Sequence, residues 1–156
     1  MTDEAPRLPP GTELVRWVQV ERRLAATPDR AYRAFADPEE LARWFPLRVE
    51  GGLAVGGRSI LVWPDRRVWW DVLEAIPNRR FVLRWPWLPD DQLVTTATVT
   101  IDPLGYGSRL SVRDGPFPID QRGVLDAWAE ALEGWAEALA MLRAYLDFSI
   151  DVRPRP

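Results

Sequence analysis

Apolar and polar residues alternate along several short segments of the first two thirds of the chain. In the segment RRFVLRWPW (79–87), every second residue from Phe81 to Trp87 is large and apolar. Such alternation places these side chains on one face of a β-strand. Similar patterns predict strands at 14–24, 47–52, 57–63, 67–76, 80–88, 92–102 and 108–114. Because the turns between the later strands are short, neighbouring strands should pair antiparallel.

Two short helices are predicted after the first strand. Thr27 followed by Pro28 is typical of a helix start, with a capping residue before a proline at the first helical position. The segment DPEE begins the second helix, with Asp37 as the N-cap and Pro38 as the first helical residue. Glu40 is then expected to reach back and complete a capping box.

A long amphipathic helix is predicted at 120–148. Its apolar residues recur at spacings of three and four, which keeps one helical face apolar for about eight turns, or roughly 40 Å. These residues are Leu125, Trp128, Leu132, Trp135, Leu139, Leu142 and Leu146. A coiled coil has a similar spacing, but two tryptophans beside Gly134 favour packing on a broad sheet. We therefore predict an α+β fold with the helix lying across a curved antiparallel sheet.

The chain contains nine tryptophans, and strand parity predicts where they point. One face should carry Ser59, Leu61 and Trp63; Trp69, Asp71 and Leu73; Phe81, Leu83, Trp85 and Trp87; Ala97, Val99 and Ile101; and Leu110 and Val112. If this face looks toward the helix, Trp128 and Trp135 oppose the strand tryptophans, whereas Trp17 and Trp70 point elsewhere. The rings then either fill a solid aromatic core or line a pocket for a flat or lipid-like ligand. A β-bulge would reverse the parity of any strand.

Composition excludes several classes of protein. The net charge is −3, and all 20 basic residues are arginines, scattered beside acidic residues rather than gathered in a stripe, which argues against nucleic-acid binding. The chain has no histidine and no cysteine. This excludes disulfides, thiol catalysis, Ser-His-Asp arrangements and the usual zinc ligands. We expect neither a metal site nor a cofactor.

The length of 156 residues predicts one domain. We expect a disordered lead-in at 1–12, the domain at 13–149 and a short tail at 150–156. No apolar run approaches the ~20 residues of a membrane span, so membrane insertion is not expected. The acidic, proline-rich start does not resemble a signal peptide, which predicts a cytoplasmic location.

Five segments together resemble a known superfamily. They are ATPDRAYRAFADPEELARWF (26–45), VGGRSI (55–60), DVLEAIPNRRFVLRW (71–85), GSRLSVRDGPFP (107–118) and GWAEALAMLRAYL (134–146). Their order resembles the START-like (SRPBCC, helix-grip) superfamily over about residues 14–148. Within it, the chain is most similar to the heat-shock-protein ATPase activator homologues in their bacterial stand-alone form. Many of these relatives have a histidine where this chain has Asp114.

The resemblance implies a seven-stranded antiparallel sheet that grips the C-terminal helix, with two small helices closing one end. It also implies an internal cavity that binds hydrophobic molecules. We therefore predict binding of a small aromatic or lipid-like molecule by a monomer or homodimer, with Trp44 and Phe45 at the mouth and Asp71 as polar anchor. The candidate ligand-binding residues are Trp44, Phe45, Leu61, Trp63, Trp69, Asp71, Leu83, Trp85, Trp87, Val99, Val112, Trp128, Leu132 and Trp135.

Two alternatives remain open at this point. A minority of the superfamily catalyses cyclisation or hydrolysis, and Asp71 is the candidate, because a carboxylate in an apolar cavity can carry a proton. Asp71 could equally pair with an arginine or accept an indole N–H, and Asp114 could simply satisfy its loop backbone. The second alternative is a protein-interaction module, stress-related or co-chaperone-like, that uses an exposed face around Trp17 and Trp70.

Overall fold

The computed structural model describes residues 14–155; the predicted lead-in at 1–12 lies outside these residues. In chain order, the elements are β1 (Val15–Leu24), α1 (Pro28–Ala36), α2 (Pro38–Leu41), β2 (Arg48–Glu50), β3 (Arg58–Val62), β4 (Arg67–Ile76), β5 (Arg80–Pro86), the 3₁₀ helix η1 (Pro89–Asp91), β6 (Val94–Leu104), β7 (Gly107–Pro118) and α3 (Val124–Phe148). Within the described residues, no helix is both long enough and apolar enough to cross a membrane.

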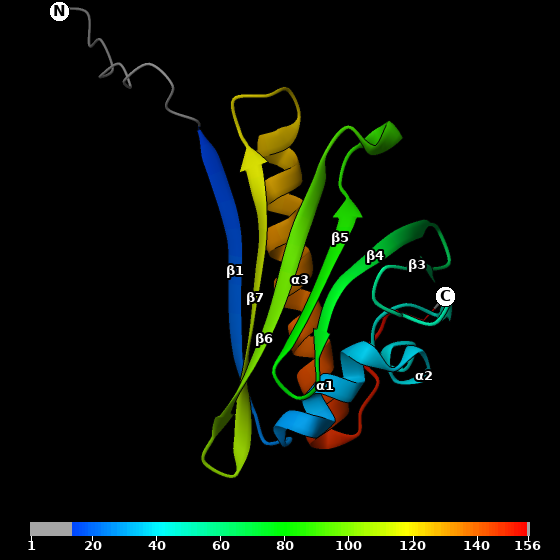
Figure 1. Cartoon of the computed structure of the whole chain (residues 1–156), viewed down its shortest axis with the longest axis vertical. Helices are drawn as coiled ribbons and strands as arrows, with labels where there is room; N and C mark the ends of the chain where they lie inside the picture. The colour runs from blue at the N-terminus through cyan, green and yellow to red at the C-terminus, as the bar shows by residue number, and fades with distance from the viewer. Residues whose placement is uncertain (1–13, 156) are drawn as a thin grey trace, which may run out of the picture.

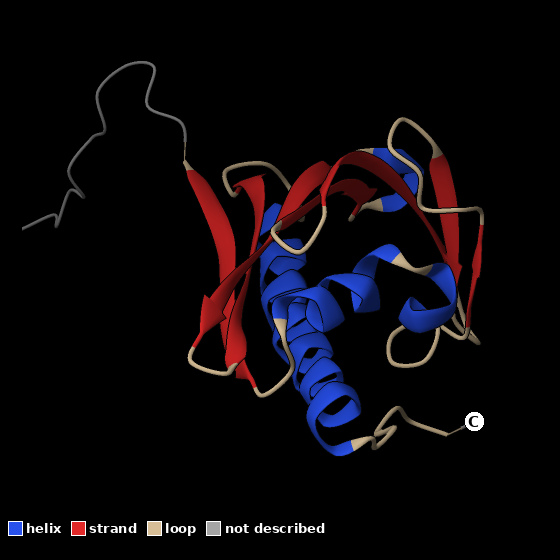
Figure 2. Cartoon of the chain, turned by 60° about the horizontal axis from the view of Figure 1, so that its bottom comes forward, coloured by secondary structure: helices blue, strands red, loops and turns tan. Residues whose placement is uncertain are grey.

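The strands form one antiparallel sheet in the order β1-β7-β6-β5-β4-β3-β2. The sheet curves around α3, and α1 and α2 lie at one end of that helix (Figures 1 and 2). The predicted α+β helix-grip fold is therefore confirmed. Its apolar core lies on the concave face, where Phe81, Leu83, Val99 and Leu110 are fully buried.

The helix starts predicted at 28 and 38 are observed, but Thr27 makes no capping hydrogen bond to α1, and the capping box predicted at α2 is absent. Asp37 caps α2 by accepting the N–H of Glu39 at 2.9 Å. Glu40 does not close the predicted capping box, because its carboxylate bonds to Arg30 and Tyr145 instead.

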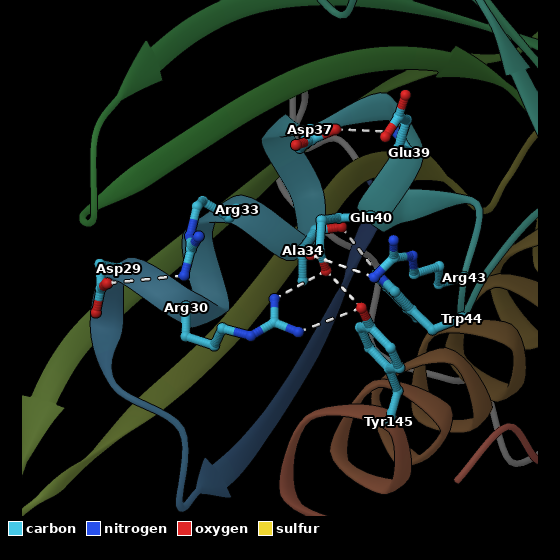
Figure 3. Close-up of polar contacts among 10 residues, drawn as sticks. All are labelled: Asp29, Arg30, Arg33, Ala34, Asp37, Glu39, Glu40, Arg43, Trp44 and Tyr145. Carbon is cyan, nitrogen blue, oxygen red and sulfur yellow. Dashed lines mark hydrogen bonds and ion pairs between the residues drawn. The ribbon is translucent and has the colours of Figure 1, made fainter. Parts of the chain in front are cut away.

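The hydrogen bonds among Arg30, Glu40 and Tyr145 join both short helices to α3 (Figure 3). Arg30 Nη1 on α1 donates to Glu40 Oε2 on α2 at 2.8 Å, and the Tyr145 hydroxyl on α3 donates to the same oxygen. Arg30 Nη2 also donates to the Tyr145 oxygen at 3.2 Å. The three side chains act as a clamp at the C-terminal end of α3.

Helix α3 is also hydrogen-bonded to β1 and to the residues that follow it. Trp128 Nε1 donates to the Trp17 carbonyl at 3.1 Å, and the Asp147 carboxylate accepts the backbone N–H groups of Ala25 and Ala26 at 2.9 and 3.1 Å. The first contact attaches α3 to β1, and the other two attach it to the segment between β1 and α1. Trp128 therefore faces β1, and the prediction that it opposes the strand tryptophans is wrong.

The parity predicted for β4 is reversed. Trp70 and Val72 are fully buried on the concave face, whereas Trp69 and Asp71 lie on the outer face. Two consecutive tryptophans give no alternation from which to choose a face, and a register shift follows Val72. The outer face also lets Asp71 pair with Arg58, its cross-strand neighbour on β3.

Candidate functional site

A cleft of about 1120 Å³ lies between α3, the β3–β4 turn, the end of β5 and the C-terminal tail. Its apolar lining combines aromatic rings with a few aliphatic side chains. These residues are Phe45, Leu47, Trp63, Pro64, Val68, Trp85, Pro86, Trp87, Leu88, Pro89, Trp135, Met141 and Pro154. Concave, mostly apolar sites of this kind are typical of small-molecule binding.

Aromatic contacts hold the walls of the cleft together. The ring of Trp85 packs edge-on against Trp87, with centroids 4.6 Å apart, and lies 5.2 Å from the ring of Trp135. Phe45 packs edge-on against Trp63 at 5.1 Å. Such edge-to-face pairs contribute about 0.5–1.5 kcal/mol beyond their buried area, so the walls are largely pre-formed.

The indole N–H groups of the wall are all hydrogen-bonded. Trp63 Nε1 donates to the Phe45 carbonyl at 3.1 Å, and Trp87 Nε1 donates to Thr95 Oγ1 at 2.8 Å. Trp85 and Trp135 both donate to Asp114, as described next. These bonds fix the orientation of each ring.

Asp114 on β7 lies behind the aromatic wall and is fully buried. Its Oδ2 accepts Trp135 Nε1 at 2.9 Å and Trp85 Nε1 at 3.1 Å, whereas its Oδ1 has no hydrogen-bond partner among the described residues. Burial raises the pKa of Asp114, against the opposing effect of the Thr95, Trp135 and Trp85 side chains. Among the described residues, the Asp114 carboxyl therefore accepts two indole N–H groups rather than a backbone N–H of its loop.

Charged residues surround the opening of the cleft. Glu130, Glu133 and Glu137 project from α3 on one side, and Arg66 and Arg67 lie in the β3–β4 turn. The Arg66 guanidinium lies 4.7 Å from the ring centroid of Trp63, within cation–π range. The opening is therefore polar and the floor aromatic.

The C-terminal tail forms part of the rim. Arg153 Nη1 donates to the carbonyls of Ala42 and Pro46 at 2.7 Å each, which attaches the tail to the segment between α2 and β2. The remaining guanidinium nitrogens bond to Asp151 and, together with the Arg153 backbone N–H, lower the pKa of Asp151 to about 2. Arg153 and Arg155 line the cleft.

The structure divides the predicted ligand-binding residues into three groups. Those that line the cleft are Phe45, Trp63, Trp85, Trp87 and Trp135. Those that are buried in the core are Trp44, Leu61, Leu83, Val99 and Val112, with Leu132 half-buried against it. Those that lie elsewhere are Trp69 and Asp71 on the outer face of β4 and Trp128 against β1.

Trp44 does not shape the mouth of the cleft. Its ring is 1% exposed, and its Nε1 donates to the Ala34 carbonyl at 2.9 Å. The ring stacks against Phe45 at 5.2 Å and therefore supports that cleft residue from behind.

Asp71 is not a polar anchor on the concave face. Arg58 Nε and Nη2 donate to its two carboxylate oxygens at 2.7 and 2.9 Å, and this pair holds the pKa of Asp71 below its usual value. The ion pair lies on the hydrated outer face, so the carboxylate has no place in the cleft. Of the exposed face predicted around Trp17 and Trp70, Trp17 is exposed as expected, whereas the prediction for Trp70 is wrong, because its side chain is fully buried.

Sequence reasoning missed several residues of the cleft. Leu47 and Leu88 stand at the ends of the predicted strands 47–52 and 80–88, but in the structure they lie in loops. The tail arginines lie near the C-terminus, where no alternation indicates a face. Met141 lies on α3 but off the apolar stripe defined by the leucines and tryptophans. The available signal was the run of aromatic and proline residues at 85–89, which ends a strand with large apolar side chains.

The comparisons agree on a family and a fold. The family model described as Activator of Hsp90 ATPase homolog 1-like protein matches residues 25–147. Protein MLL2253 from Mesorhizobium loti is similar in structure, with 27% identity and a TM-score of 0.75 over 86% of this chain and 99% of that chain. Among curated proteins, no sequence matches this chain.

Two further solved structures, at lower identity, share the fold. DynU16, from the dynemicin biosynthetic locus, has 22% identity and a TM-score of 0.76 over 88% of this chain and 49% of that chain. The Aha1 dimer from Colwellia psychrerythraea has 16% identity and a TM-score of 0.73 over 85% of this chain and 96% of that chain.

Proposed function

Since the chain belongs to the Activator of Hsp90 ATPase homolog 1-like family, we propose that it binds a small hydrophobic molecule, aromatic or lipid-like, between its sheet and α3. The helix-grip fold of this family is a ligand-binding type of domain. The observation that carries the proposal is the cleft itself, whose floor is formed by Trp85, Trp87 and Trp135.

The volume and walls of the cleft support a ligand of drug-like size or larger. Pockets for such molecules usually measure about 300–1,000 Å³, and this cleft of about 1120 Å³ is open to solvent on one side. Ring faces at right angles, as in the Trp85–Trp87 pair, offer a flat molecule both stacking and edge contacts. DynU16, which shares the fold, is described as a protein of the dynemicin biosynthetic locus, and this is consistent with a small-molecule ligand.

The first experiment is native mass spectrometry of freshly purified protein, with a solvent extract of the same sample analysed beside it. A co-purified small molecule would support the proposal and give the chemical class of the ligand. The protein is then titrated with Nile red, a neutral aromatic dye that becomes fluorescent in apolar sites. We expect saturable binding with one site per chain.

Two tryptophan variants locate the dye. Trp63→Ala removes a half-buried cleft wall and should weaken dye binding about tenfold or more, by analogy with the loss of a well-packed aromatic contact. Trp17→Ala is the matched control, because the Trp17 ring lies on β1, away from the cleft. This variant should bind the dye as tightly as the wild type does. Equal dye affinities in all three proteins, or no saturable binding, would overturn the proposal.

Assembly and location remain predictions. The Aha1 of Colwellia psychrerythraea is described as a dimer, and for this chain we propose a monomer or homodimer in the cytoplasm. Light scattering of the purified protein at several concentrations measures the oligomeric state, and cell fractionation measures the location.

A further inference from the structure

Asp114 is a buried ionisable group that touches two walls of the cleft at once. It lies on β7, and its bonding partners lie on β5 and α3. We propose that Asp114 is a positioning residue: its protonation state sets the orientation of Trp85 and Trp135 and thereby makes ligand affinity depend on pH. The part that concerns affinity rests on the proposed function, whereas the part that concerns the indoles does not.

The geometry concentrates both indole bonds on a single oxygen. Trp135 and Trp85 donate to Oδ2 at 2.9 and 3.1 Å, and no described residue donates to Oδ1. A hydrogen bond to an ionised carboxylate is about twice as strong as one to a neutral acceptor. Protonation of Asp114 should therefore weaken both hydrogen bonds, which link Trp135 on α3 and Trp85 on β5 to the same carboxyl.

The absence of a described hydrogen-bond partner for Oδ1 favours the neutral form of the Asp114 carboxyl over the ionised form. A buried carboxylate with an unsatisfied oxygen is costly, whereas a neutral carboxyl can carry its proton there. The Thr95 hydroxyl accepts Trp87 Nε1 at 2.8 Å and also lowers the pKa of Asp114, so it favours the ionised carboxylate, in opposition to burial. A third cleft tryptophan is thus connected to the same carboxyl.

No titratable neighbour in the described core competes with Asp114. Val18 on β1 and Ala97 on β6 are its cross-strand partners, and the remaining groups that face it are Trp85, Trp87, Thr95 and Trp135. On β7, the adjacent Arg113 turns to the other face, where it lies over Trp17. The charged residues of α3 that line the cleft are Glu130, Glu133 and Glu137, all exposed. The core carboxyl should therefore titrate in one step.

The first test follows the indole N–H signals by ¹H–¹⁵N NMR of the full chain between pH 4 and 8. The signals of Trp85 and Trp135 should move together with one midpoint above the usual aspartate range, whereas that of Trp63, bonded to a backbone carbonyl, should not follow them. Asp114→Asn keeps an oxygen acceptor and should abolish the movement. Static signals in the wild type, or movement that persists in Asp114→Asn, would overturn the positioning role.

The second test measures Nile red affinity over the same pH range. The wild type should bind about threefold or more tightly above the NMR midpoint than below it, because firmly held indoles pre-organise the walls. Asp114→Asn should bind the dye with an affinity independent of pH. If the indoles titrate but the affinity stays constant, the link to ligand binding is wrong. If the dye binds at no pH, the proposed function fails, and the NMR result alone still decides the role of Asp114.

Discussion

Replacing Trp135 by alanine removes the side chain that joins α3 to the sheet beneath the cleft. The ring is 1% exposed, lies 5.2 Å from Trp85 and 6.4 Å from Phe45, and donates to Asp114 at 2.9 Å. Truncation of a buried tryptophan to alanine costs about 3–5 kcal/mol. Because the change also leaves Asp114 with one indole donor instead of two, we expect the upper part of this range. Total stabilities of about 5–15 kcal/mol make such a loss easy to detect.

Trp135→Phe separates packing from hydrogen bonding. It keeps an aromatic ring but loses the N–H that Asp114 accepts, and should cost about 1–3 kcal/mol. Both variants are compared with the wild type by urea denaturation followed by far-UV circular dichroism, which does not depend on the number of tryptophans. Dye binding by Trp135→Ala should weaken in parallel.

Trp69→Ala is the matched control for stability. That ring lies half-exposed on the outer face of β4, with its N–H on Asp91 and the Arg58 guanidinium 4.1 Å from its centroid. Its loss should cost less than about 1.5 kcal/mol. If Trp135→Ala were no less stable than Trp69→Ala, α3 would not be packed on the sheet through Trp135, and the reasoning would be refuted.

Three further predictions concern the clamp, the tail and pH. Tyr145→Phe removes the hydroxyl that donates to Glu40 and should lower the free energy of unfolding by about 1 kcal/mol; an unchanged urea midpoint would contradict the clamp. Arg153→Ala removes both bonds from Nη1 to the segment between α2 and β2, so amide hydrogen exchange at 150–155 should quicken, and unaltered exchange would show that the tail is held by other contacts. Asp114 has a raised pKa in the folded chain, so above the ordinary aspartate pKa of 3.8 the folded chain holds more protons than the unfolded chain. The free energy of unfolding of the wild type, relative to that of Asp114→Asn, should therefore fall as pH rises above 3.8. If this free-energy difference stayed constant or rose, the direction of the pKa shift would be contradicted.

Strand and helix positions were largely predictable from local pattern. The predicted strand at 67–76 matches β4, and the alternation from Phe81 correctly grouped Leu83, Trp85 and Trp87 on one side. Both patterns are short-range properties, because side-chain direction alternates with every residue along a strand. The first two helices likewise begin where a capping residue precedes a proline.

The candidate site was less predictable, and two carboxylates show why. Asp71 stands between Trp70 and Val72, whereas Asp114 stands between Arg113 and Gly115, and the sequence favoured Asp71 as the buried carboxylate. In the structure, Asp71 pairs with Arg58 outside, whereas Asp114 is buried beneath two indoles. Cross-strand register decides this, and a register shift of one residue exchanges the two faces.

The sequence by itself determined the element order, the antiparallel connectivity and the long apolar face of α3, because periodicity and turn chemistry act over a few residues. Tertiary structure alone decided which tryptophans line a cleft and which fill the core. Phe45, Trp63, Trp85 and Trp135 come from four separate segments, and their distances depend on sheet curvature and register. Arg153 attaches the tail to the rim by donating to carbonyls more than a hundred residues away in the chain. Such long-range contacts cannot be predicted from local sequence, because the residues around one partner carry no periodic pattern that indicates the position of the other.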